Sequence, residues 1–577
     1  MQDQNLKNFL MNIVQKYSSP QPNYRNNNDF SKNLVNSFGL DNNIVDKLFC
    51  KNESISSNPL IFSEANTGLW YNWANSIGSK YVSISYSAGT TYLFNNSNPL
   101  VQPYIEIFSK EQVNSEIKPT PEYTITLQEQ GIRSLLLVDN LCSRPYLLIG
   151  TFTYPVTNVQ STCKMLKWDF TINKLSTLYT FYDTNSIRSI VRYQNSCYDY
   201  IIFSTQTDTN SSTILPKIYY VKEKHIKNSE CYRPYHFVIL RYDCENIYGS
   251  IWDLHLDSDT LYVSIPKQSV DSDKLSGFNI RGRLYYFNLL KLFKKNVDII
   301  ELYSIIDNKV YPNGFEINSI STFQVETNPD TDIVYVYSLS DFLYQIESLN
   351  LQKTLSSKIT PDITLLELLT IIRSLISNFD IDGTRIFSFD KKNLYKKSPP
   401  ILSTVVGTSV FNTIVKSKTS NGYNNFANVY TWCSTSYHNE FYFGTLDIRS
   451  TLYVSLVTAI ANILDMPELI PALLSLPENL IILITEFIFD PNFILDTNID
   501  FTDKQLYFDV IKINSCTETT EKITSRGFST VDGINPRGDD GCRNINIVNN
   551  NNGRFLLIGT TCYQKNNYAK NFTLQIK

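Results

Sequence analysis

The sequence predicts an all-β fold, a β-propeller of about seven blades with an N-terminal helical arm and helical insertions. The first observation is a repeated phrase: Gly131–Leu137 leads to Leu147–Thr151 in the same way that Gly541–Ile547 leads to Leu556–Thr560. The second is composition, since 38 Tyr and 33 Phe among 577 residues suit strands better than helices. The third is the Asn, Asp, Ser and Gly residues between the apolar runs, which favour tight turns. Each copy therefore predicts two strands joined by a turn.

Weaker copies of the phrase lie between the two clear ones. They occupy Ser186–Thr205, Ser250–Ser264 and Asn428–Thr445, with a degenerate copy at Asn318–Ser338 and a candidate first copy at Lys80–Phe108. Six or eight blades remain open alternatives to seven. The last copy is followed by a single further strand, so we expect an N-terminal strand to complete the last blade and remove its exposed edge.

Three segments fall outside the repeat. Residues 1–58 form the predicted helical arm, and the propeller of residues 59–577 carries insertions near 351–395 and 451–495. The arm has apolar residues at helical spacing, which make it a candidate for docking on its own propeller or on a neighbouring copy: Leu6, Phe9, Leu10, Ile13 and Val14.

Both insertions contain apolar runs. Thr364–Ile376 predicts one helix. Prolines and acidic residues interrupt the segment Leu452–Phe493, so short helices are favoured over a membrane hairpin and no membrane span is expected. An apolar insertion of this kind is also a candidate assembly surface.

Charge argues against nucleic-acid binding. The chain has 51 basic and 55 acidic residues and a net charge of −4, so it offers no basic field to neutralise phosphates. We therefore expect no nucleic-acid partner.

The ten cysteines show no metal-binding spacing. There is no Cys-x-x-Cys pair and no Cys/His cluster, so no metal site is expected. The closest pairs in sequence are Cys231 with Cys244 and Cys542 with Cys562, which makes them the disulfide candidates. Buried thiols are the alternative.

No catalytic or cofactor-binding motif is present. The four histidines form no metalloprotease motif, and phosphate-binding and dinucleotide-binding glycine loops are missing. We expect neither a catalytic constellation nor a cofactor.

The repeat places residues of one kind at matching positions. Arg133, Arg188 and Arg543 either converge as a cationic ring or lock blades together by bonding carbonyl groups of the adjacent blade. Trp252 and Tyr430 fill the corresponding positions of other copies. The glycines that close the phrase, Gly150 and Gly559, belong to the same predicted blade-locking set.

The phrase Gly-x-Arg-Ser followed by Leu-Ile-Gly-Thr resembles that of giant-virus, mimivirus-like β-propeller repeat proteins. A residue usage rich in Asn, Ile, Lys and Tyr is typical of an AT-rich genome and agrees with this resemblance. The resemblance implies a non-enzymatic structural protein of the virion or its surface fibrils, whose partners are copies of itself and other virion proteins. The host cytoplasm or an extracellular surface is the alternative location. The alternative function is a propeller enzyme, a glycan hydrolase or lyase with carboxylates at the central funnel.

Overall fold

The computed structural model describes most of the predicted strands and the helices of both insertions. The described residues are 60–65, 71–87, 102–114, 118–139, 144–153, 162–182, 184–207, 217–228, 234–240, 251–266, 282–295, 299–301, 303–306, 309–312, 314–317, 320–340, 355, 365–376, 383–396, 400–408, 414–416, 419–463, 465, 478–489, 508–524, 541–561 and 569–576.

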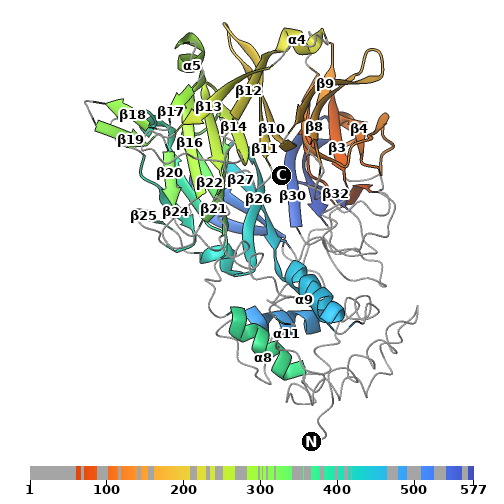
Figure 1. Cartoon of the computed structure of the whole chain (residues 1–577), viewed down its shortest axis with the longest axis vertical. Helices are drawn as coiled ribbons and strands as arrows, with labels where there is room; N and C mark the ends of the chain where they lie inside the picture. Colours follow the sequence, from red (N-terminus) through yellow and green to blue (C-terminus); the bar gives the residue numbers. More distant parts are fainter. Residues whose placement is uncertain are drawn as a thin grey trace, which may run out of the picture.

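The chain is mostly β, and its strands fall into consecutive antiparallel groups of four, as in the blades of a propeller (Figure 1). The first groups are β2 (Asn75–Ile77), β3 (Tyr81–Tyr86), β4 (Tyr104–Ser109) and β5 (Tyr123–Thr126), then β6 (Gly131–Val138), β7 (Tyr146–Phe152), β8 (Thr162–Asp169) and β9 (Lys174–Tyr182), then β10 (Thr184–Gln194), β11 (Asp199–Thr207), β12 (Lys217–Lys222) and β13 (Tyr235–Leu240). The next are β14 (Asp253–Asp257), β15 (Thr260–Ile265), β16 (Gly282–Asn288) and β20 (Gly314–Ile317), then β21 (Ile320–Thr327), β22 (Ile333–Ser340), β23 (Ile386–Asp390) and β24 (Ser403–Val406). The last are β26 (Asn428–Tyr437), β27 (Glu440–Asp447), β28 (Val510–Asn514) and β29 (Thr519–Thr524), then β30 (Gly541–Asn550), β31 (Gly553–Thr561), β32 (Lys570–Gln575) and β1 (Leu60–Glu64).

The last group contains the first strand of the chain. β1 pairs antiparallel with β32, with Leu60 opposite Thr573. This pairing confirms that an N-terminal strand completes the group of the last repeat copy. The first and last groups also share one core, in which Val82 and Ile84 pack with Val548 and Leu557. The two ends of the described chain are thereby joined by both hydrogen bonds and apolar burial.

Several short strands lie outside the groups of four. β17 (Ile299–Glu301) runs parallel to β13, and β25 (Ile414–Val415) runs parallel to β24, so each extends the outer edge of a group. β18 (Tyr303–Ile306) and β19 (Lys309–Pro312) form a separate hairpin at the periphery of the strands (Figure 1).

Both insertions contain helices, as predicted. They are α8 (Leu365–Ile376), α9 (Arg449–Ile463) and α11 (Glu478–Phe489), which lie together at one end of the molecule (Figure 1). No helix in the described ranges is long and apolar enough to cross a membrane. Among the described residues there are also five short helical segments: η3 (Lys110–Gln112), α4 (Glu223–Lys227), α5 (Leu289–Lys295), η5 (Lys391–Asn393) and η6 (Asn421–Asn424).

The apolar side chains of α9 and α11 do not form the uncovered surface that the sequence suggested. Leu456, Ile460, Ile482 and Leu483 are all buried. α11 contacts both α8 and α9, so the helices cover one another's apolar faces. These described side chains are therefore covered within the chain, and the role of Leu452–Phe493 as an assembly surface stays a prediction.

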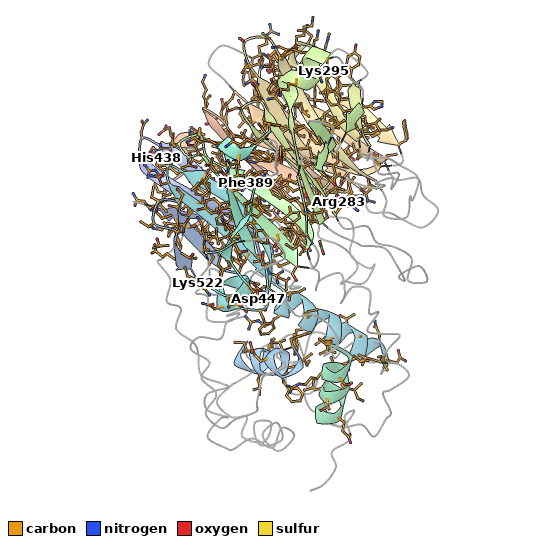
Figure 2. The ribbon with its side chains drawn as sticks, turned by 90° about the vertical axis from the view of Figure 1, so that its left-hand side faces the viewer. Arg283, Lys295, Phe389, His438, Asp447 and Lys522 are labelled. Carbon is orange, nitrogen blue, oxygen red and sulfur yellow. The ribbon has the colours of Figure 1, made fainter. Side chains whose placement is uncertain are left out.

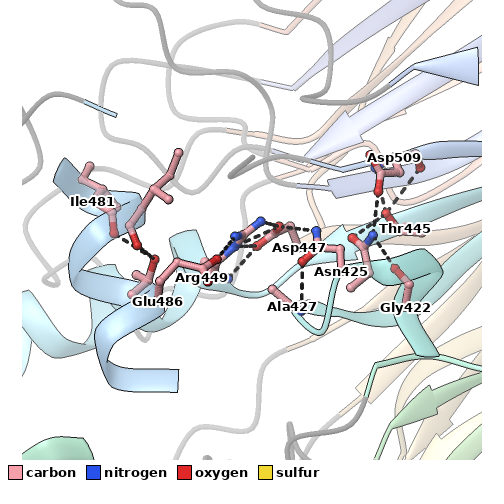
Figure 3. A network of polar contacts seen from close by, with 12 residues as sticks. Gly422, Asn425, Ala427, Thr445, Asp447, Arg449, Ile481, Glu486 and Asp509 are labelled. Atoms are coloured by element: carbon pink, nitrogen blue, oxygen red, sulfur yellow. Dashed lines mark hydrogen bonds and ion pairs between the residues drawn. The ribbon is translucent and has the colours of Figure 1, made fainter. Parts of the chain in front are cut away.

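A buried ion network joins the helices to the strands. Asp447 ends β27, and its carboxylate accepts hydrogen bonds from the Arg449 guanidinium, with Nη2 2.5 Å from Oδ2. The same guanidinium donates through Nη1 to Glu486 of α11 at 2.7 Å (Figure 3). Asp447 lies where the strands give way to the helices (Figure 2). Because Arg449 bonds both carboxylates, it fixes the start of α9 and the middle of α11 to the end of β27.

Candidate functional site

The repeated phrase contains a β-bulge, and the bulged residue is the one that the repeat singles out. In β6 the pairing with β7 skips Arg133, so that Ile132 faces Thr151 and Ser134 faces Gly150. A bulge turns one side chain out of the regular alternation of the strand. The pairings skip residues at the same place in β10, β21, β26 and β30, and the skipped residues are Arg188, Ser321, Trp432 and Arg543.

The two remaining groups have an equivalent residue just before their first strand. Trp252 donates its backbone N–H to Ser264, which also pairs with Asp253, so Trp252 is the extra residue. In the first group, Tyr71 pairs with Ser87 and Asn75 pairs with Ile84. The segment between these pairs is one residue longer on the Trp73 side, so it contains a bulge. Trp432 therefore occupies the bulge, and Tyr430, which the sequence placed there, lies two residues earlier.

The bulged residues of neighbouring groups stack on one another. The Arg133 guanidinium lies 3.9 Å from the centre of the Trp73 ring. Arg543 lies 4.7 Å from the Trp73 ring and 4.8 Å from the Trp432 ring. Arg188 lies 3.5 Å from the Trp252 ring. Each contact is a cation–π interaction between adjacent groups, worth about 0.5–2 kcal/mol depending on desolvation.

Tyr430 links Trp252 to Trp432 across the group of β21, whose bulged residue is the small Ser321. Its hydroxyl accepts a 3.0 Å hydrogen bond from the Trp252 indole N–H, and its ring lies 5.7 Å from that of Trp432. We name the set Trp73, Arg133, Arg188, Trp252, Tyr430, Trp432 and Arg543 the Arg/Trp belt. It draws on the groups of β2, β6, β10, β14, β26 and β30.

One carboxyl group lies beside the belt. Burial raises the pKa of Asp253, whereas the positive charges of Arg188 and Arg543 lower it. Arg188 also donates to the Trp252 carbonyl at 2.9 Å and to Gln206 Oε1 at 3.2 Å. The Arg188 guanidinium thus bonds a carbonyl of the next group, as predicted for a blade-locking residue. It also lies in a cluster of positive charges.

The glycines of the phrase mark close approaches between groups. A Cβ at Gly150 would overlap Ser134 Oγ and come within 2.9 Å of Ile187 in the next group. A Cβ at Gly559 would overlap the Asn72 side chain of the first group. Glycine at these positions therefore lets inner strands approach one another.

One of the four disulfide candidates, Cys542, lies among the described residues, beside a cysteine of another group. Cys542 Sγ lies 3.4 Å from Cys433 Sγ, and both thiols are buried between β26 and β30. This separation exceeds a disulfide bond, and the described cysteines are free thiols. Cys231, Cys244 and Cys562 lie outside the described residues, as do the five residues of the predicted arm, Leu6, Phe9, Leu10, Ile13 and Val14.

A second polar site, which the sequence did not single out, lies between β21 and β26. The Glu326 carboxylate accepts hydrogen bonds from Ser434 Oγ at 2.6 Å and Ser436 Oγ at 2.8 Å. Burial raises the pKa of Glu326 to about 7, although both serine contacts lower it. His255 bonds the next residue, Thr327, at 2.7 Å, and burial lowers the pKa of His255 to about 4. Sequence motifs could not predict this site, because it forms only where β21 and β26 lie side by side.

Metal ligands do not gather in the described part of the chain, where no group of three or more His, Cys, Asp or Glu residues could hold an ion.

Comparison with known proteins returns no family. No family model matches the chain, and no curated protein matches it. Among solved structures, a Pyrococcus horikoshii acylaminoacyl peptidase is similar with a TM-score of 0.29 and 8% identity, over 66% of this chain and 44% of that one. A Trypanosoma rangeli sialidase in complex with sialic acid is similar with a TM-score of 0.30 and 8% identity, over 69% of this chain and 56% of that one. The tricorn protease is similar with a TM-score of 0.34 and 9% identity, over 91% of this chain and 36% of that one.

The chain thus spans about half the length of the first two of these proteins. Likenesses of this extent carry no information on substrate or activity.

Proposed function

We propose that the seven groups of strands are the blades of one closed propeller. Every junction between successive groups has a contact that supports closure. β7 pairs with β10, β22 with β26, and β27 with β30. The other junctions are bridged by Ile132 N to Ser87 Oγ, Arg188 to the Trp252 carbonyl, Phe323 N to Ser264 Oγ, and Tyr71 with Thr561.

We propose that this propeller is a non-enzymatic scaffold that works through protein contacts. The observation that carries this proposal is the Arg/Trp belt, which places stacked cations and indoles along the inner strands. A glycan hydrolase places two carboxyl groups there, about 5–9.5 Å apart. The described bulge positions carry Trp, Arg or Ser instead.

A rigid projection supports the same function. The ion network of Asp447, Arg449 and Glu486 fixes the helices of the insertions to the strands. We propose that copies of the chain assemble through residues 1–58. The helices α8, α9 and α11 would then keep a fixed position beside the propeller in each copy. A role in a virus particle or its surface fibrils is the setting that the residue usage and the repeated phrase suggest.

Size-exclusion chromatography with light scattering tests the proposal on the full chain and on a variant that lacks residues 1–58. We expect the full chain to form higher-order species and the variant to stay a folded monomer. A matched variant that lacks residues 1–65 also loses β1 and should lose stability, because β32 then has an open edge. A full chain that stays monomeric at high concentration would refute the proposed function.

Glu326 favours a second candidate, the propeller enzyme. A carboxyl group that stays protonated near pH 7 can act as a general acid, and Glu326 has a pKa of about 7. Hydrolysis or lyase activity on a polysaccharide panel that is lost in Glu326→Gln would establish this function. Activity that survives Glu326→Gln, or no activity at all, would leave Glu326 a buried hydrogen-bond acceptor.

A further inference from the structure

The Arg/Trp belt contains hydrogen-bond donors that lack acceptors. The indole Nε1 of Trp73 is buried and has no hydrogen-bond partner among the described residues. The Arg133 guanidinium, which carries five donors, lies on this indole and has no carboxylate partner in the described part of the chain. A buried donor without an acceptor is costly, so this pair favours a ligand that supplies acceptor oxygens.

A second cation adjoins this pair. Ser134 Oγ donates to the Ile187 carbonyl at 2.8 Å, so the residues that directly follow Arg133 and precede Arg188 are bonded across the two strands. The two arginines therefore start from adjacent points on β6 and β10. Each is backed by its own indole, Trp73 or Trp252. Arg133 and Arg188 are both partly exposed residues, which leaves the pair open to a solute.

The belt carries three cations, Arg133, Arg188 and Arg543. The described acid Asp253 interacts with Arg188 and Arg543, whereas Arg133 has no carboxylate partner among the described residues. A cation that is partly buried against aromatic rings is costly unless an opposite charge lies nearby. Guanidinium groups present planar pairs of N–H donors that match the oxygens of carboxylates and phosphates.

We propose that the Arg/Trp belt binds a small oxyanion, a carboxylate or phosphate group, between Arg133, Arg188 and the Trp73 indole N–H. The oxyanion supplies the acceptors that Trp73 and Arg133 lack and balances the charge of Arg133. The site is independent of assembly, since its residues lie within the inner strands and not in residues 1–58.

Isothermal titration calorimetry of the full chain with inorganic phosphate, and separately with succinate, tests this site, with chloride at equal ionic strength as the reference. We expect one anion per chain. Binding of phosphate alone, of succinate alone or of both supports the site and identifies the group it prefers. Indole fluorescence should change in the same titration, because the anion lies against Trp73.

Three variants locate the site. Arg133→Gln removes the charge that has no carboxylate partner and should weaken binding at least 10-fold, and Trp73→Phe keeps the ring, loses the N–H and should weaken it several-fold. Arg144→Gln removes an exposed arginine from the far end of the same hairpin and should leave affinity unchanged. Circular dichroism confirms that each variant is folded, and Arg133→Lys replaces Arg133→Gln if the latter is not. No binding above the chloride reference, or equal affinity in the Arg133 and Arg144 variants, would overturn the proposal.

Discussion

Replacing Arg449 with methionine should cost more stability than the loss of any single surface charge. The side chains of Asp447, Arg449 and Glu486 are exposed by only 0%, 2% and 5%. Methionine keeps most of the volume of the arginine stem but leaves two buried carboxylates without their cation. Breaking a buried pair in this way costs about 3–5 kcal/mol. We expect a loss of that size in the free energy of unfolding, measured by urea titration and far-ultraviolet circular dichroism.

The pH dependence of this loss has a fixed sign. Burial already raises the pKa of Asp447 to about 6, although Arg449 lowers it. Without Arg449 this pKa rises further, so the folded protein binds a proton that the unfolded chain releases near pH 4. Stability of the Arg449→Met variant should therefore fall as the pH rises from about 4 through the folded-state pKa, and the deficit should be larger at pH 8 than at pH 5.

Two controls bracket the result. Lys392→Met removes the ion pair between Lys392 and Asp332, whose side chains are 68% and 54% exposed, and should change stability far less than Arg449→Met does. The triple variant Asp447→Asn, Arg449→Met and Glu486→Gln removes all three charges and should recover part of the loss. A deficit for Arg449→Met no greater than that for Lys392→Met would refute the assignment of Arg449 as the link between helices and strands.

Three further predictions concern the contacts between inner strands. Glu326→Gln should abolish the loss of stability that wild type undergoes as the pH rises from about 4.5 to 7. At pH 8 its free energy of unfolding by urea should therefore exceed that of wild type by about 2–3 kcal/mol; equal pH profiles would contradict this. Treatment with a small-molecule disulfide should join Cys433 to Cys542, whose sulfurs are 3.4 Å apart, and peptide mass spectrometry without reduction should find the linked pair rather than two free thiols. Gly444→Ala should lower the urea midpoint by the equivalent of about 1–3 kcal/mol, because the added Cβ overlaps Cys542 and lies 2.8 Å from Cys433 Sγ; an unchanged midpoint would show that the strands can separate freely.

The repeated phrase was sufficient to locate the hairpins, but it did not show which residue occupies each β-bulge. β6 with β7 and β30 with β31 lie where the phrase predicts them. The assignment of Tyr430 to the arginine position failed because counting from the start of an apolar run assumes regular pairing. A bulge adds one residue to a strand, so register is set from the Gly-Thr end, where Gly444 faces Cys433.

Contacts between groups could not be predicted from the sequence, because residues that meet there are far apart along the chain. Cys542 lies beside Cys433 of the preceding group, a neighbour that spacing along the chain did not indicate. Glu326 stood out in no motif, because its serine partners belong to β26. The repeated arginines were predicted to share a role. Their stacking on Trp73 and Trp252 was not predicted, because these indoles belong to other groups.

The pairing of β1 with β32 has a consequence for the order in which the protein can be made. During synthesis β1 leaves the ribosome before the other described strands and lacks its partner strand until β32 follows the last copy of the phrase. The other groups can form in turn as their strands emerge, since each is contiguous apart from its insertions. The final group is therefore the last to be completed, and β1 stays without its partner strand while the other groups form. A circular permutant that places β1 directly after β32 would remove this wait, and its faster refolding would show that pairing of β1 with β32 sets the rate.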